Sequence, residues 1–70
     1  MFNKFKIGQK VRVKGIGKNE EKYYSNEIGK VVEKDDFFCD YLVTFNNDTS
    51  DWFDEKYLTP IRNYKKRRNE

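Results

Sequence analysis

The stretch EIGKVVEKDDFFCDYLVTFNNDTSDWF, from Glu27 to Phe53, decides the fold of this chain. It holds three runs rich in β-branched and aromatic residues, over 28–32, 41–45 and 49–53. Asp, Asn, Ser and Gly separate these runs, and that composition is typical of short antiparallel strands joined by hairpins. Three strands of this length cannot close on themselves, so we expect the strands on either side to complete a small barrel.

Strict alternation identifies the residues that face the interior of this barrel. Residues 10–14 and 39–46 both alternate with period two, which is the pattern of a half-buried strand. Cys39 lies on the inward face of the second segment and is expected at the edge of the core. The predicted core set is Val11, Val13, Tyr41, Val43, Phe45, Phe53 and Leu58.

The remaining elements follow from turn residues and breaks in the pattern. Residues 15–26 form a loop, 28–34 a second strand, 54–57 a helical turn and 58–61 a last strand. Gly29 indicates a bulge or a close backbone approach, which leaves open whether Val31 or Val32 faces inward. The architecture predicted is therefore all-β, a five-stranded barrel over 1–61 with one short helical turn before the last strand.

Three groups of aromatic or apolar residues lie outside the regular alternation. Phe2, Phe5 and Ile7 are expected to cover one end of the barrel. Of Tyr23 and Tyr24, one ring is expected to anchor the loop to the core while the other stays exposed, because neighbouring side chains of an extended backbone point in opposite directions. In the hairpin connection 35–38, one of Phe37 and Phe38 is expected to cap the barrel while the other lies exposed.

Composition narrows the chemistry available to the chain. Among its 70 residues there is one cysteine and no histidine, so Ser-His or Cys-His catalysis and a Cys/His zinc site are excluded. We therefore expect a protein that is not an enzyme and uses no metal or cofactor. No apolar run reaches the length of a membrane span, and we expect a cytoplasmic monomer without membrane association. The lysine- and asparagine-rich composition would suit a phage or plasmid accessory protein.

The charges are divided into three blocks along the chain. Residues 1–34 hold nine cations and four anions, residues 35–59 one cation and seven anions, and residues 60–70 five cations and one anion. Because a barrel brings these blocks together, the net charge of +3 does not by itself indicate a nucleic-acid partner. Residues 62–70 have no periodicity and are expected to form a basic flexible tail.

The order of five short strands, a long first loop and a helical turn before the last strand resembles SH3-like barrels, including KOW-type and mind-bomb-type modules. The segment from Tyr23 to Val31, YYSNEIGKV, also looks like the Tyr-rich Asn-acidic-Val-Gly-Thr-Val segment of photosystem I reaction-centre subunit IV. In this chain a three-residue turn replaces the long loop between the last strands of that subunit. The resemblance implies an SH3-like fold, and it indicates little about the function of the chain.

Our first functional hypothesis is a protein-interaction module with an aromatic and acidic surface. Trp52 alternates with Phe53 and is expected on the surface, and SH3-like barrels commonly bind ligands between the first loop and the end of the sheet. Such a surface would suit a basic or proline-rich peptide. The residues proposed for it are Tyr24, Asp48, Asp51, Trp52, Asp54 and Tyr57.

The alternative hypothesis is a nucleic-acid-binding barrel. Lys10, Arg12 and Lys14 form one outward row on the first strand, where they could contact phosphates or simply discourage pairing at a sheet edge. The tail would add Lys65, Lys66, Arg67 and Arg68, which attract phosphates by counterion release.

Overall fold

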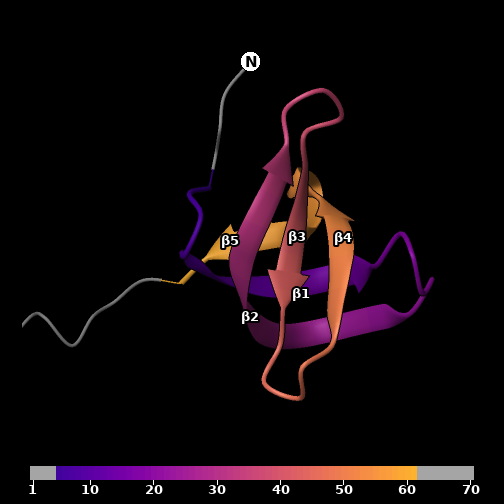
Figure 1. The fold of residues 1–70 in the computed structure, drawn as a ribbon. Coiled ribbons are helices and arrows are strands. Elements are labelled where there is room, and N and C mark those ends of the chain that lie inside the picture. Colours follow the sequence, from indigo (N-terminus) through magenta and orange to yellow (C-terminus); the bar gives the residue numbers. More distant parts are fainter. Residues whose placement is uncertain (1–4, 62–70) are drawn as a thin grey trace, which may run out of the picture.

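The computed structural model describes residues 5–61 as five antiparallel strands in one sheet, in the order β4-β3-β2-β1-β5 (Figure 1). A short 3₁₀ turn, Glu55–Tyr57, precedes the last strand, and Asp54 caps its start. The predicted all-β class and the helical turn before the last strand are confirmed. The strands are β1 Lys10–Ile16, β2 Tyr23–Asp35, β3 Asp40–Thr44, β4 Ser50–Asp54 and β5 Leu58–Pro60.

Strand β2 is the element that gives the sheet its shape. Its first part pairs with β1 and its second part with β3, and the pairing shifts register once with each partner. The shift against β1 leaves Asn26 unpaired with a positive φ of 64°, and the shift against β3 falls at Val32. Such bulges bend a strand. In Figure 1, β2 curves so that β1 and β5 cross β3 and β4.

The prediction of a closed barrel is wrong, because the strands pair as an open sheet. Within residues 5–61, the edge strands β4 and β5 are not hydrogen-bonded to each other. Strand β5 has three residues, and Pro60 in it has no N–H to donate, so it offers little to a further pairing. The interior is enclosed by the bend of the sheet instead.

The core lies between the two halves of this bent sheet. All seven predicted core residues are buried, and Phe5, Tyr24 and Val31 complete the cluster. The ring of Tyr24 stacks on Phe45 at 4.8 Å and meets Phe53 edge-on at 5.1 Å. Because Val31 is fully buried and Val32 is half-buried, the inward residue of that pair is Val31.

Several expectations for the ends and turns need correction. Neither Phe37 nor Phe38 reaches the core: they are 83% and 62% exposed in the β2–β3 turn, where both backbone N–H groups donate to Asp35. Ile7 is also exposed, whereas Phe5 is buried and Phe2 lies outside the described residues. Cys39 is half-buried and precedes β3, with a φ of 60°.

At Gly29 the backbone of β2 lies close to β3, and the position is not a bulge. A side chain there would collide with Val43 and with the backbone of Thr44. The two bulges of β2 fall three residues to either side of this position.

Candidate functional site

The six residues proposed for an aromatic and acidic surface do not form one cluster. Asp51 and Tyr24 are buried, at 0% and 3% exposure, so their predicted placement on the surface is wrong. Asp48 is exposed in the turn between β3 and β4. Only Asp54 and Tyr57 line the same groove.

Asp51 acts as an internal anchor. Its Oδ1 accepts hydrogen bonds from the backbone N–H groups of Asn19 and Trp52, at 2.8 and 2.7 Å, and its Oδ2 accepts one from Glu20 at 3.1 Å. A buried carboxylate requires such partners because its desolvation is costly. The residue therefore fixes the loop between β1 and β2 against β4. Its position two residues before the core residue Phe53 was the sequence signal for an inward side chain.

Tyr24 belongs to the aromatic core. The phenol is surrounded by Phe45 and Phe53, and burial is the main cause that raises its pKa above the ordinary value. Tyr23, its neighbour, is 57% exposed. The pair thus contains one inward and one outward ring as predicted, but the inward one is the residue that had been assigned to the surface.

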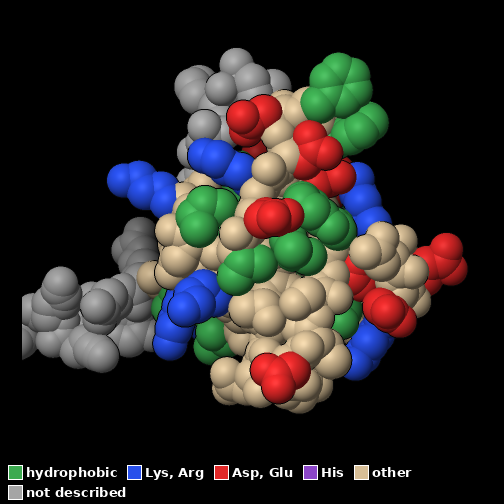
Figure 2. Space-filling model, viewed as in Figure 1, with side chains coloured by type: hydrophobic (Ala, Val, Ile, Leu, Met, Phe, Trp, Pro, Cys, Tyr) green, Lys and Arg blue, Asp and Glu red, His purple; other side chains and the backbone are tan. Residues whose placement is uncertain are grey.

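Trp52 lies on the outer face of β4, opposite Leu42 of β3, and both side chains are half-buried. Figure 2 shows hydrophobic side chains gathered on the face over β2, β3 and β4, with acidic side chains among and above them. Trp52 was expected on the surface, and its half-buried side chain on the outer face of β4 agrees with that expectation.

An open groove near two of the predicted residues, Asp54 and Tyr57, lies between the β1–β2 loop and the 3₁₀ turn. This Tyr57 groove has a volume of about 550 Å³. Its apolar part comes from Ile16, which is 49% exposed, and from half-buried Tyr57. The residues that line it are Ile16, Gly17, Lys18, Glu21, Asp54, Lys56 and Tyr57.

Close packing on β1 holds the ring of Tyr57 in this groove. A Cβ atom at Gly15 would overlap that ring, so only glycine allows the 3₁₀ turn to lie against the strand. Lys56 places its Nζ 5.4 Å from the centre of the same ring, on the solvent side of the turn. The groove wall is therefore fixed by the backbone beneath it rather than by a flexible side chain.

The charges around the Tyr57 groove are mainly acidic once ion pairs are considered. Lys18 donates to both oxygens of Asp40, at 2.9 and 2.8 Å, and this hydrogen-bonded pair raises the pKa of Lys18. Within residues 5–61, Glu21 and Asp54 take part in no ion pair. The Asp54 carboxylate accepts a hydrogen bond from the backbone N–H of Lys56, at 3.3 Å. Two carboxylates without an ion pair thus share the groove with one ammonium group that also lacks one, that of Lys56.

A second candidate surface, the basic face, covers the outside of β1. Lys10, Arg12 and Lys14 are all exposed there, and Lys30 of β2 lies directly opposite Lys10. On the other side, Thr59 of β5 lies opposite Arg12. The predicted row of three cations is therefore exposed as a unit, while the tail residues assigned to the same function lie outside the described residues.

Three contributors to these surfaces escaped the sequence analysis. Ile16 was placed in a loop, although an isoleucine between two glycines was a visible sign of an exposed apolar residue. The Lys18–Asp40 pair joins residues 22 positions apart, and no local pattern indicates it. Lys30 could be assigned to the basic face only once the register of β1 and β2 was known.

No protein-family model matches the chain, and no match is found among curated proteins or solved structures. In the part of the chain that the structure describes, no helix is long and apolar enough to cross a membrane. The Tyr57 groove and the basic face are therefore the two candidate binding surfaces of the described residues.

Proposed function

We propose that this chain is a non-enzymatic binding module whose open, bent five-stranded sheet is SH3-like, and that it binds a protein segment in the Tyr57 groove. The observation that supports this most directly is that exposed Ile16 and half-buried Tyr57 line one groove together with Glu21 and Asp54, two carboxylates that form no ion pair within residues 5–61. An apolar floor with an acidic rim suits a peptide that combines an apolar or proline side chain with a Lys or Arg. Trp52 on the adjoining sheet face would extend the contact.

Ile16→Asp and Ile28→Asp form a matched pair of variants for this proposal. Both isoleucines are exposed in strands, at 49% and 47%, but only Ile16 lines the Tyr57 groove. A peptide array of Arg- or Lys-containing apolar and proline-rich segments should yield ligands for the wild-type chain. We expect Ile16→Asp to lose them and Ile28→Asp to retain them, with unchanged circular dichroism in both. Equal binding by the two variants would remove the groove from the proposal.

Nucleic-acid binding through the basic face is the second candidate function. The exposed row of three cations on β1, extended by Lys30, supports it. This function predicts low-salt binding of DNA or RNA that weakens steeply as salt is added. Truncation after Ile61 should weaken it further, because the tail cations are then absent. A native-lysate pull-down with and without nuclease treatment separates the two candidates.

A further inference from the structure

Four residues on the outer face lie opposite one another in register across four neighbouring strands. Lys10 of β1 lies opposite Lys30 of β2, Lys30 lies opposite Thr44 of β3, and Thr44 lies opposite Ser50 of β4. Directly opposite residues on one face of an antiparallel pair have Cβ atoms about 5 Å apart. The row therefore presents two ammonium groups followed by two hydroxyl groups on neighbouring strands.

The two lysines of this row have no counter-charge in the described chain. Neither Lys10 nor Lys30 takes part in an ion pair or a side-chain hydrogen bond within residues 5–61. Like charges directly opposite each other destabilise a sheet. A bound anion would relieve this repulsion.

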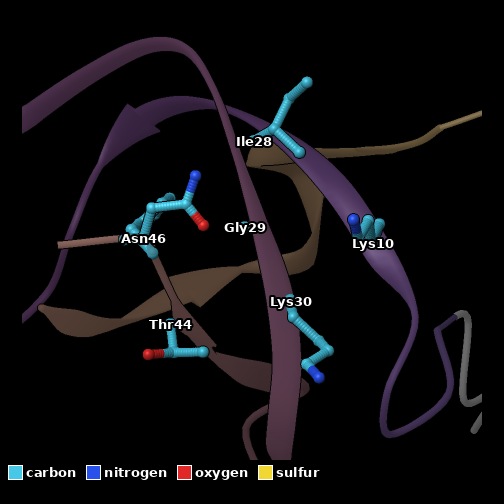
Figure 3. A pocket seen from close by; sticks show the side chains of 7 residues that line it. Lys10, Ile28, Gly29, Lys30, Thr44 and Asn46 are labelled. Carbon is cyan, nitrogen blue, oxygen red and sulfur yellow. The ribbon is translucent and has the colours of Figure 1, made fainter. Parts of the chain in front are cut away.

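A pocket of about 410 Å³ lies at the same place (Figure 3). Besides Lys10, Lys30 and Thr44, it is lined by Asn46, whose side chain extends toward Gly29. Lysine ammonium groups and an asparagine amide are hydrogen-bond donors, and the Thr44 hydroxyl, which donates to the carbonyl of Thr49 at 3.4 Å, would have to turn from that bond to donate to an anion. These are the groups that contact phosphate oxygens in nucleic-acid complexes.

We propose that this pocket holds one phosphate group of a nucleic-acid strand that lies along the basic face. The inference rests on the second candidate function and adds to it a defined subsite, with Lys30, Thr44 and Asn46 as contacts beyond the β1 row. A strand is favoured over an isolated phosphate because Lys10 continues into Arg12 and Lys14. These cations recur about every 7 Å along β1, which suits a linear polyanion.

The test measures fluorescence anisotropy of a labelled single-stranded oligonucleotide of about 12 nucleotides, a length within the range that small barrels bind. The full chain is compared with Lys10→Gln, Lys30→Gln and the control Lys22→Gln, whose lysine is exposed in the β1–β2 loop. We expect the pocket variants each to weaken binding about threefold near 50 mM salt. Each should also lower the salt-dependence slope by about 0.7, the value for one phosphate contact on a single strand. Lys22→Gln should change neither quantity.

Nuclear magnetic resonance spectra of the same samples report where the ligand binds and whether each variant is folded. The amide signals of Lys30, Thr44 and Asn46 should shift on titration with the oligonucleotide. If Arg12→Gln and Lys14→Gln weaken binding but the pocket variants do not, the subsite is wrong and the second function stands. If the wild-type chain binds no oligonucleotide at low salt, both fail. A phosphoserine peptide that binds more tightly than the oligonucleotide, and is lost in Lys30→Gln, would overturn the assignment to nucleic acid.

Discussion

Asp51 stabilises the β1–β2 loop with a buried carboxylate that accepts three backbone hydrogen bonds. Two of the donors, Asn19 and Glu20, belong to the loop, and the third is the following residue, Trp52. Gly17 lies so close that a Cβ atom there would collide with the same carboxylate. The loop is therefore tied to the sheet through its backbone, and its position depends little on the side chains that it exposes to solvent.

Replacing Asp51 by Asn should destabilise the protein by about 1–3 kcal/mol, because an amide N–H₂ cannot accept the hydrogen bonds of the oxygen that it replaces. Asp48→Asn makes the same chemical change at an exposed turn position and should alter the free energy of unfolding by less than about 0.5 kcal/mol. Urea denaturation of both variants measures the difference. Equal stabilities would mean that the carboxylate is not a structural anchor.

Residue-scale patterns predict the interior better than they predict the surface. Alternation placed Val11, Val13 and Val43 in the core because one face of each strand is covered. For Tyr23 and Tyr24, alternation predicts only that the two rings diverge. Which ring points inward is decided by the register against β1, and that register shifts at Asn26. No feature of the sequence located that bulge.

At the scale of elements, the β1–β2 loop and the 3₁₀ turn form the two walls of the Tyr57 groove. The loop is attached to β4 by Asp51 and by the hydrogen bond from the backbone of Lys18 to Trp52, at 2.9 Å. The side chain of Lys18 reaches farther, to Asp40 at the start of β3. One loop thus contacts two strands that are neighbours in the sheet but distant from it in sequence.

Lys18→Gln should lower the free energy of unfolding by about 0.5–1 kcal/mol at pH 7, a modest amount because the lysine side chain is 46% exposed. The hydrogen bond to Asp40 raises the pKa of Lys18 in the folded protein. The stabilisation is therefore complete below the unfolded pKa of 10.5 and is lost as the pH rises through the folded value. Urea denaturation at pH 7 and pH 11 should show that the difference between wild type and Lys18→Gln shrinks at high pH.

The exposed lysine Lys56 provides a control for that experiment. It lies at the 3₁₀ turn with no ion pair among the described residues, so Lys56→Gln should change the free energy of unfolding at pH 7 by less than about 0.5 kcal/mol. If Lys18→Gln were as stable as wild type at pH 7, the contact with Asp40 would not hold the loop. Residue spacing alone could not have predicted this contact, because it depends on the fold of the whole β1–β2 connection.

At the scale of the whole molecule, the described chain carries two candidate binding surfaces of different charge. The Tyr57 groove has an acidic rim, and the basic face covers the outside of β1. The charge blocks of the sequence do not predict these two surfaces, because Glu21 of the groove belongs to the same block as the cations of β1. Ile16 also follows Lys14 on the exposed face of β1, so the two functions are distinguished by substituting different side chains.

The same bent sheet predicts which parts of the chain are needed for folding. All of the described core lies between Phe5 and Leu58, and Phe5 packs edge-on against Tyr41 at 5.2 Å. Residues 5–9, the lead-in before β1, also form two backbone hydrogen bonds with Val31. The N–H of Gly8 donates to the carbonyl of Val31 at 2.7 Å, and the N–H of Val31 donates to the carbonyl of Gln9 at 2.9 Å. We therefore expect residues 1–61 to fold with a free energy of unfolding within about 0.5 kcal/mol of the full chain.

Removing residues 1–9 should have the opposite effect, because it deletes a buried phenylalanine and two hydrogen bonds of the sheet. Loss of a buried Phe side chain costs about 3–5 kcal/mol, and a domain of this size has roughly 3–5 kcal/mol in total. The shortened chain should then be unfolded at 25 °C by circular dichroism, while Phe5→Leu, which keeps an apolar side chain in place, should remain folded with an intermediate stability. A folded 10–70 chain, or an unfolded 1–61 chain, would show that the interior is not closed by the lead-in and the five strands as described.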